Sequence, residues 1–198
     1  MSHKIATLKE VPKLVLCLVA GAGNMGLRHS QGLLRFMPES SVVLVDPDKW
    51  NLRSSLGVLR EEFGDRVSIV QEFAELPSRA EVAVIAVPAD HRSQVALNLE
   101  RIGFNGHLLL EKPVAVAGNE IDQLVPLSRS FASIHVNFAR RLYPLMRKLR
   151  SHLDGQRIQS LSVSGTRWGL ASNGPHFVDL VTYLNASEAL TAEVKPTS

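Results

Sequence analysis

The chain has 198 residues, enough for one complete domain with a buried core, or for one domain and part of a second. Its apolar content of 45% and charged content of 21% are those of a globular protein, which excludes wholesale disorder. The formal net charge of +3 is too small to drive nucleic-acid binding without a concentrated basic patch, so no nucleic-acid partner is expected. No apolar stretch reaches the length of a membrane-spanning helix, so no membrane partner is expected either.

The first part of the chain alternates short apolar runs with amphipathic stretches, a pattern typical of a parallel sheet with crossover helices. Strands are expected over residues 14–20, 42–45, 67–70, 82–87, 107–110 and 133–136. Helices are expected over residues 27–36, 49–63 (with Asp48 as the N-cap), 90–102 and 120–128. The predicted fold class is therefore α/β, a Rossmann-type doubly wound parallel sheet, over residues 1–136.

The pattern changes at Asn137, and residues 137–198 are expected to begin a second, α+β domain. Helices are expected over residues 141–153 and 175–184. Between them, residues 159–166 alternate polar and apolar side chains, which predicts a half-exposed strand with an exposed sheet edge. The chain thus combines a first domain with part of a second.

The single cysteine, Cys17, lies in the first apolar run and cannot form an internal disulfide. This favours a reducing compartment and predicts a cytoplasmic location. His135 and His152 have no metal-ligand spacing with any partner, so no metal is expected.

The loop after the first expected strand has the spacing Gly-x-Gly-x-x-Gly, formed by Gly21, Gly23 and Gly26 with Asn24 and Met25 between them. Gly21 permits a tight turn, Gly23 lets the backbone approach a pyrophosphate, and Gly26 lets the helix pack closely on the strand. The N-terminus of the helix offers N–H groups and a partial positive charge to the phosphates. The loop predicts a dinucleotide site, with a purely structural strand-to-helix turn as the alternative.

Asp46 ends the second expected strand, where its carboxylate is placed to accept hydrogen bonds from adenosine ribose hydroxyls. Such a carboxylate repels a 2′-phosphate, so NAD is favoured as the cofactor over NADP. Lys49 and Arg53 are close enough to soften that preference, which leaves NADP open. The alternative for Asp46 is a simple turn residue before Pro47.

Several motifs, in this order, resemble the Gfo/Idh/MocA oxidoreductases, the group of glucose–fructose oxidoreductase and inositol dehydrogenase. The motifs are the glycine loop, Asp46-Pro47-Asp48, Ala86-Val87-Pro88, Glu111-Lys112-Pro113, Asn137-Phe138-Ala139-Arg140-Arg141 and Gly174-Pro175-His176 with Asp179. The resemblance spans residues 14 to about 185 and implies hydride transfer between NAD(P) and a hydroxyl-bearing carbon of a sugar, cyclitol or sugar nucleotide. It also implies that Val87, Pro88 and Glu111 contribute to the cofactor site.

By the same resemblance, Lys112 lies beside the nicotinamide and hydrogen-bonds the reacting oxygen, and His176 acts as an acid/base or positions the substrate hydroxyl. The expected substrate contacts are Asn137, Arg141, Asn173 and Asp179, the last also placed to orient the imidazole ring. The family usually has an aspartate four positions before the histidine, and this chain has Ser172 there, which cannot serve as a proton acceptor at neutral pH. The alternatives are a surface lysine before a proline turn for Lys112, a helix-end histidine with a local polar partner for His176, and a solvated arginine at a helix start for Arg141.

Family members usually continue well beyond this length, so the chain resembles a C-terminally truncated member. Two functions follow: an oxidoreductase acting on a small sugar-like molecule, or a nucleotide-binding module without turnover. Self-association into a homo-oligomer is left open. His91 and Arg92 are assigned no role beyond lining the site, and His29 is expected to face the surface or pack locally.

Overall fold

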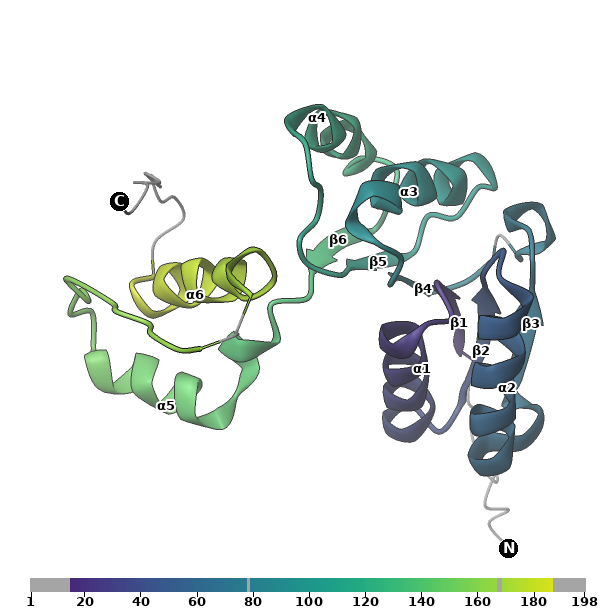
Figure 1. The fold of residues 1–198 in the computed structure, drawn as a ribbon, viewed down its shortest axis with the longest axis horizontal. Helices are drawn as coiled ribbons and strands as arrows, with labels where there is room; N and C mark the ends of the chain where they lie inside the picture. The colour runs from purple at the N-terminus through teal and green to yellow at the C-terminus, as the bar shows by residue number, and fades with distance from the viewer. Residues whose placement is uncertain (1–14, 78, 167–168, 187–198) are drawn as a thin grey trace, which may run out of the picture. The chain divides into compact units, whose positions relative to one another are not determined.

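The computed structural model describes residues 15–77, 79–166 and 169–186, and the chain divides into two compact units, Met1–His135 and Val136–Ser198 (Figure 1). The strands are β1 (Val15–Ala20), β2 (Ser40–Val45), β3 (Val67–Val70), β4 (Val82–Ile85), β5 (His107–Leu110) and β6 (Ser133–Val136). The helices between them are α1 (Asn24–Phe36), α2 (Lys49–Phe63), α3 (Arg92–Arg101) and α4 (Gly118–Leu127). Short 3₁₀ turns are η1 (Gly64–Arg66), η2 (Phe73–Glu75) and η3 (Ala89–His91).

The six strands form one sheet in the order β3-β2-β1-β4-β5-β6. β1 pairs in parallel with both β2 and β4, with Leu18 opposite Val43 on one side and Ala83 on the other. β3 continues the sheet beyond β2, and β5 continues it beyond β4, again in parallel. The strand order reverses between β1 and β4, so the structure confirms the predicted Rossmann-type fold class.

Both faces of the sheet are covered, because successive residues of β1 enter opposite cores. Cys17 and Val19 belong to a cluster with Leu34 of α1 and Leu52 of α2. Leu18 and Ala20 belong to a second cluster, which is completed by apolar side chains of α3 and α4, among them Val95, Leu99 and Leu124. A continuous apolar strand is expected where helices cover both faces, as the runs of aliphatic residues predicted.

Most element boundaries in the first unit agree with those predicted. Asp48 is the N-cap of α2, as expected, and its Oδ1 accepts hydrogen bonds from the backbone N–H groups of Trp50 (2.7 Å) and Asn51 (3.4 Å). β4 ends at Ile85, two residues before the predicted end, and η3 precedes α3 where a continuous helix was expected. These differences lie at element ends, where a residue must choose between ladder, turn and helix bonds.

The second unit contains η4 (Ala139–Leu142), α5 (Pro144–Leu153) and α6 (Leu170–Leu184). The strand predicted over residues 159–166 is wrong: none is formed there, and each of these side chains is exposed. Alternation of polar and apolar residues can make a strand only where a neighbouring strand supplies hydrogen bonds and a core covers the apolar face. Within the described part of the second unit no strand is formed beside residues 159–166 and nothing covers their apolar side chains, so the predicted sheet edge is wrong as well.

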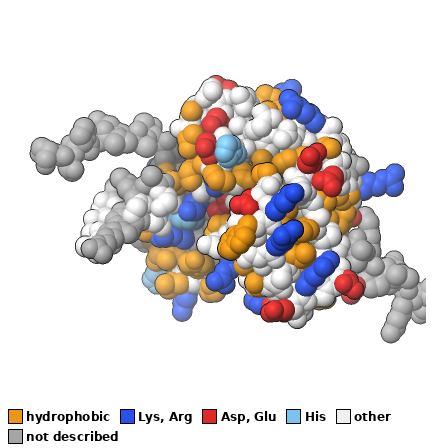
Figure 2. Space-filling view, turned by 45° about the vertical axis from the view of Figure 1, so that its right-hand side comes forward, with side chains coloured by type: hydrophobic (Ala, Val, Ile, Leu, Met, Phe, Trp, Pro, Cys, Tyr) orange, Lys and Arg blue, Asp and Glu red, His pale blue; other side chains and the backbone are white. Residues whose placement is uncertain are grey.

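In the described ranges, no helix combines the length and the apolar character needed to cross a membrane. On the face seen in Figure 2, lysine and arginine side chains are interspersed with aspartate and glutamate side chains. The charges on that face are therefore mixed in sign. Arg35 of α1 and Glu62 of α2 form an exposed pair, with two hydrogen bonds of 2.7 Å between the guanidinium and the carboxylate.

Candidate functional site

The glycine loop joins β1 to α1, and its inner side is tightly packed against the backbone of neighbouring segments. Gly21 has a φ of 96°, and a Cβ there would lie 3.0 Å from the backbone of Ala86 and Val87. A Cβ on Gly26 would lie 1.7 Å from the carbonyl oxygen of Gly21, so only glycine allows α1 to start this close to the loop. Both glycines therefore bring the backbone segments together as the sequence predicts.

The outer side of the same loop is open. A Cβ on Gly23 would meet nothing within 4 Å, and Gly23 is the N-cap of α1 with no side chain to occupy the first N–H groups of the helix. A helix start of this kind attracts an anion through its N–H groups and the helix dipole. The loop is packed against backbone on its inner side and open on its outer side, so it fits the pyrophosphate of a dinucleotide.

Asp46 lies at the end of β2 and contacts two loops at once. Its Oδ2 accepts a hydrogen bond from the N–H of Ala22 at 2.7 Å, and its Oδ1 accepts one from the N–H of Asp48 at 2.8 Å. The carboxylate therefore holds the glycine loop against the start of α2. A carboxylate has about four acceptor sites, so its remaining lone pairs can accept hydrogen bonds from ribose hydroxyls.

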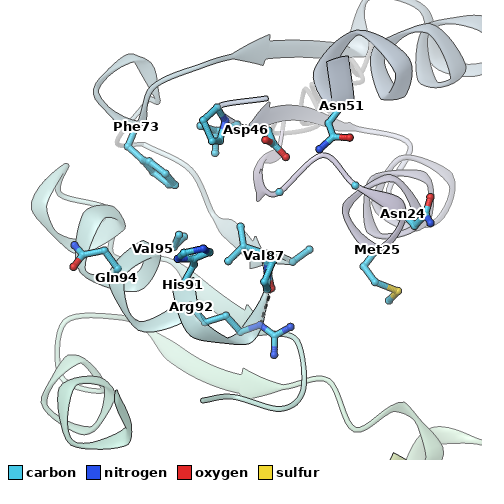
Figure 3. Close-up of a pocket in the computed structure, with 16 residues that line it drawn as sticks. Asn24, Met25, Asp46, Asn51, Phe73, Val87, His91, Arg92, Gln94 and Val95 are labelled. Carbon is cyan, nitrogen blue, oxygen red and sulfur yellow. Dashed lines mark hydrogen bonds between the residues drawn. The ribbon is translucent and has the colours of Figure 1, made fainter. Parts of the chain in front are cut away.

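A cleft of about 690 Å³ opens above the carboxyl ends of β1, β2 and β4 (Figure 3). Figure 3 shows Asp46 and Asn51 on one wall, with Asn24 and Met25 beside them. The remaining wall comes from the β4 end and α3, and its residues are Val87, Pro88, His91, Arg92, Gln94 and Val95, with Phe73 from η2. The switch point of a doubly wound sheet is where such folds bind ligands.

Most of the residues predicted for the cofactor meet in this one cleft. Its lining includes Gly21, Gly23, Asn24, Met25, Asp46, Val87 and Pro88. Gly26 lies behind the loop, and Glu111 follows β5, with only 3% of its surface exposed. The glycine-loop side and the β4 side of the predicted site are thus brought together by the parallel pairing of β1 and β4.

Arg92 is the main residue whose contacts sequence reasoning missed. It is the first residue of α3 and is 7% exposed. Its Nε donates to the carbonyl oxygen of Val87 at 2.9 Å, and its Nη1 donates to the carbonyl oxygens of Glu111 (2.8 Å) and Pro113. Burial lowers the pKa of Arg92, while the charges of Glu111 and Asp90 oppose that shift.

A signal for Arg92 was present in the sequence. Its partners on the buried face of α3 are Val95, Ala96 and Leu99, which follow at the i+3, i+4 and i+7 positions. An arginine in register with an apolar stripe is directed inward, and a buried guanidinium needs hydrogen-bond acceptors. The carbonyl groups at the ends of β4 and β5 supply them.

His29 of α1 also lies differently from the expectation of a surface or locally packed residue. Its Nε2 is 2.8 Å from Oε1 of Glu111, 82 positions away in the chain. The other carboxylate oxygen, Oε2, accepts a hydrogen bond from the backbone N–H of Lys112 at 3.2 Å. Helix α1, which starts at the glycine loop, is therefore connected to the turn that carries Lys112, and the Lys112–Pro113 peptide bond in that turn is cis.

In the second unit, two of the predicted substrate contacts bind each other. The Nε of Arg141 in η4 donates to Oδ2 of Asp179 in α6 at 3.0 Å, and its Nη2 donates to Oδ1. Asp179 is 8% exposed, so this bidentate pair compensates a buried charge. The pairing gives both residues a structural contact that the sequence did not predict.

The other predicted residues of the second unit cluster around α6. His176 packs edge-on against Phe138, with ring centroids 5.9 Å apart and an interplanar angle of 82°. Arg140 lies over the ring of Phe177 at 4.1 Å and donates to Oδ1 of Asn173 at 3.3 Å. Asn137, just after β6, is half-buried. Aromatic and cationic side chains thus hold η4 against the helix that carries His176.

Ser172, where the family usually has an aspartate, donates a hydrogen bond from its Oγ to the carbonyl oxygen of Gly169 at 3.1 Å. A hydroxyl used in this way stays neutral, so the position supplies no proton acceptor. In the described ranges, no group of three or more histidine, cysteine, aspartate or glutamate side chains is arranged to hold a metal ion.

Comparison with known proteins identifies a family for the first unit. Residues 15–137 match the model of the Gfo/Idh/MocA oxidoreductase family, described as having an NAD-binding Rossmann fold. No curated protein sequence matches the chain.

Solved structures agree in fold. A myo-inositol dehydrogenase from Lactobacillus casei, in complex with NAD(H) and myo-inositol, has a TM-score of 0.70 at 17% identity, covering 88% of this chain and 55% of its own. A putative myo-inositol dehydrogenase from Sinorhizobium meliloti has a TM-score of 0.68 at 20% identity, covering 88% of this chain and 56% of its own. The WlbA dehydrogenase from Chromobacterium violaceum, in complex with NADH and UDP-GlcNAcA, has a TM-score of 0.63 at 15% identity, covering 91% of this chain and 58% of its own. The chain therefore spans just over half the length of these structures.

Proposed function

The chain belongs to the Gfo/Idh/MocA oxidoreductase family, whose NAD-binding Rossmann fold covers residues 15–137, and from this premise we propose a specific activity. It transfers a hydride between a nicotinamide cofactor and the hydroxyl-bearing carbon of a sugar, cyclitol or sugar nucleotide. Residues 1–136 bind the dinucleotide, and residues 137–198 begin a substrate-binding domain. The proposal includes a cytoplasmic location, supported by the buried and unpaired Cys17.

The observation that carries the proposal is the cleft at the switch point of the sheet. One side of it has the glycine loop and Asp46, which fit a pyrophosphate and an adenosine ribose. In a fold with this strand order the second mononucleotide half lies beyond the reversal, over β4 and β5. In this proposal that half of the site binds the nicotinamide, and the turn carrying Lys112 directly follows β5.

The bound nicotinamide supplies the hydride acceptor or donor. Lys112 hydrogen-bonds the hydroxyl oxygen of the substrate and takes its proton when the carbon is oxidised, or returns a proton when it is reduced. His176 positions a substrate hydroxyl or exchanges a proton with it. Because Ser172 is neutral, the proposal routes no proton through that position.

Substrate binding in this proposal falls to polar side chains near α6. Asn173 and Asn137 offer amide groups to sugar hydroxyls, and Arg141 with Asp179 keeps η4 in contact with α6 while presenting the outer edge of the guanidinium. The side chain of Arg141 is 41% exposed, which leaves part of it open to a ligand. Myo-inositol and UDP-GlcNAcA, each present in complex with one of the similar solved structures, are the first substrates to test.

The cofactor proposal is tested by calorimetric titration with NADH and NADPH. Asp46→Asn keeps an acceptor for the N–H of Ala22 but removes the negative charge, so discrimination against NADPH should fall. Asp46→Ala removes the acceptors as well and should weaken NADH binding. Glu61→Gln, an exposed acidic residue of α2, is the matched control. Equal NADH and NADPH affinities in the unchanged chain would contradict the preference for NAD.

The catalytic proposal is tested by NADH absorbance with myo-inositol, free sugars and UDP-sugars as substrates. Lys112→Ala should lower kcat by roughly 10²- to 10⁴-fold, the usual contribution of a positioned acid/base, while NADH still binds. Lys148→Ala, on the exposed side of α5, is the control. Tight NADH binding without turnover of any of these compounds would support the alternative, a nucleotide-binding module, instead.

A further inference from the structure

We propose that Arg92, together with the contact between His29 and Glu111, positions the turn of Lys112 relative to the glycine loop. It thereby determines where the nicotinamide half of the dinucleotide binds. This inference rests on the proposed function, since it concerns the same dinucleotide site. Arg92 acts here as a positioning residue, through the backbone that it holds.

The first part of the argument is what Arg92 bridges. Val87 follows β4, whereas Glu111 and Pro113 follow β5, and one guanidinium donates to a carbonyl oxygen of each. Backbone carbonyls after the end of a strand have lost their ladder partners and need other donors when buried. Arg92 supplies these donors from a fixed planar fork, so the two strand ends are held at one separation.

The second part is how the same turn is held from the opposite face of the sheet. Glu111 is almost fully buried, and His29 reaches it from α1, whose N-terminus forms the floor of the pyrophosphate site. The same carboxylate accepts the N–H of Lys112. A shift of α1 relative to β5 would therefore move the backbone of Lys112, which couples the phosphate end of the site to its nicotinamide end.

Helix α3 does not depend on Arg92 for its place. Val95, Ala96 and Leu99 of this helix are buried in the core against the sheet. Replacing Arg92 should therefore leave the helix packed and free chiefly the carbonyls of the two turns. The adenosine side, formed by the glycine loop and Asp46, has contacts of its own.

The test compares two ligands that differ in the nicotinamide. NADH occupies both halves of the site, while ADP-ribose lacks the nicotinamide ring and reports on the adenosine and pyrophosphate contacts. Arg92→Gln should weaken NADH about tenfold or more, whereas the affinity for ADP-ribose should stay within about twofold. Arg92→Lys should give an intermediate loss for NADH, because an ammonium cannot bridge both turns with fork geometry. Arg101→Gln, an exposed residue of the same helix, should change neither affinity.

A double-mutant cycle tests whether Arg92 acts through the Lys112 turn. The loss of NADH affinity caused by His29→Asn should be smaller in the Arg92→Gln background than in the unchanged chain, because the turn is already displaced. His29→Asn should weaken NADH in the same direction, with ADP-ribose again spared. Thermal unfolding of each variant identifies any that fail to fold, and in that case Arg92→Lys and His29→Asn carry the test.

The outcomes separate this inference from the function on which it rests. Failure of the unchanged chain to bind NADH overturns both. Normal NADH binding together with an equal loss of both ligands in the Arg92 variants overturns only the positioning role, because it shows a general structural effect. Full additivity in the cycle, or variants that bind NADH as the unchanged chain does, would overturn it too.

Discussion

Replacing Gly26 by alanine should disrupt the dinucleotide site through a single methyl group. The added Cβ would lie 1.7 Å from the carbonyl oxygen of Gly21, whereas real Cβ contacts essentially never fall below 3.0 Å, so loop and helix must separate by at least 1.3 Å, the difference between the two. The atom that it meets is backbone, which cannot rotate away as a flexible side chain can.

The magnitude follows from two opposing effects. Overpacking of this kind typically costs about 1–3 kcal/mol. Alanine in a helix gains about 1 kcal/mol over glycine. The matched control is Gly32→Ala in the same helix α1, where the new Cβ would meet nothing within 4 Å and only the helix gain applies. Gly32→Ala should therefore stabilise the chain, and Gly26→Ala should destabilise it by up to about 2 kcal/mol, the overpacking cost less the helix gain.

The ligand should report the clash more sharply than stability does. A displacement of about 1.3 Å exceeds the roughly 0.5 Å range over which N–H···O hydrogen bonds remain good, so the loop would lose bonds to the pyrophosphate. Urea unfolding followed by circular dichroism measures the stability of both variants, and calorimetry measures NADH affinity. Gly26→Ala should bind NADH at least about tenfold more weakly, a loss of roughly 1.4 kcal/mol. Unchanged stability and affinity in this variant would refute the reasoning.

Three other substitutions test separate contacts. Burial raises the pKa of Cys17 from 9.0 to about 11, so between these pH values the folded chain keeps the thiol proton that the unfolded chain releases. The free energy of unfolding should therefore fall as the pH rises from 9.0 to about 11, and urea unfolding of Cys17→Ala should show a smaller fall. Arg66 donates to the carbonyl oxygens of Leu34, Met37 and Ser40, so Arg66→Ala should cost about 1–3 kcal/mol in urea, while an unchanged midpoint would show that water replaces these bonds. Arg141→Gln leaves the buried carboxylate of Asp179 without its partner and should cost about 3 kcal/mol; hydrogen exchange should show faster opening of α6, whereas unaltered protection would count against a structural role for the pair.

Most of the residues predicted for the cofactor line one cleft, and the sequence signals for the glycine loop and Asp46 are local. The glycine spacing is a local pattern, Gly26 is required by the carbonyl group of Gly21 five positions earlier, and Asp46 directly follows the strand that precedes it. The resemblance to the family added Val87, Pro88, Glu111 and Lys112, none of which has a distinctive pattern of its own. Their roles remain proposals, since the structure shows where they lie and which groups they contact.

The misses have a common origin in contacts between distant parts of the chain. His29 and Glu111 are 82 positions apart, and Arg141 and Asp179 are 38 apart. A charged or polar side chain carries no mark of its partner, because the partner is chosen by the packing of elements that are far apart in sequence. Residues 159–166 show the converse, since their alternating pattern was real but no neighbouring strand is formed beside it in the described residues.

The sequence by itself determined the fold class, the glycine loop, the cap of α2 and the strands of the sheet, because these depend on side-chain type and short-range spacing. The tertiary structure alone decided which carbonyls Arg92 bridges, that His29 reaches Glu111, and that Arg141 binds Asp179. Burial explains the division: once a charged group is taken out of water it must find partners within the fold, and only the packed arrangement of strands and helices determines which groups are within reach.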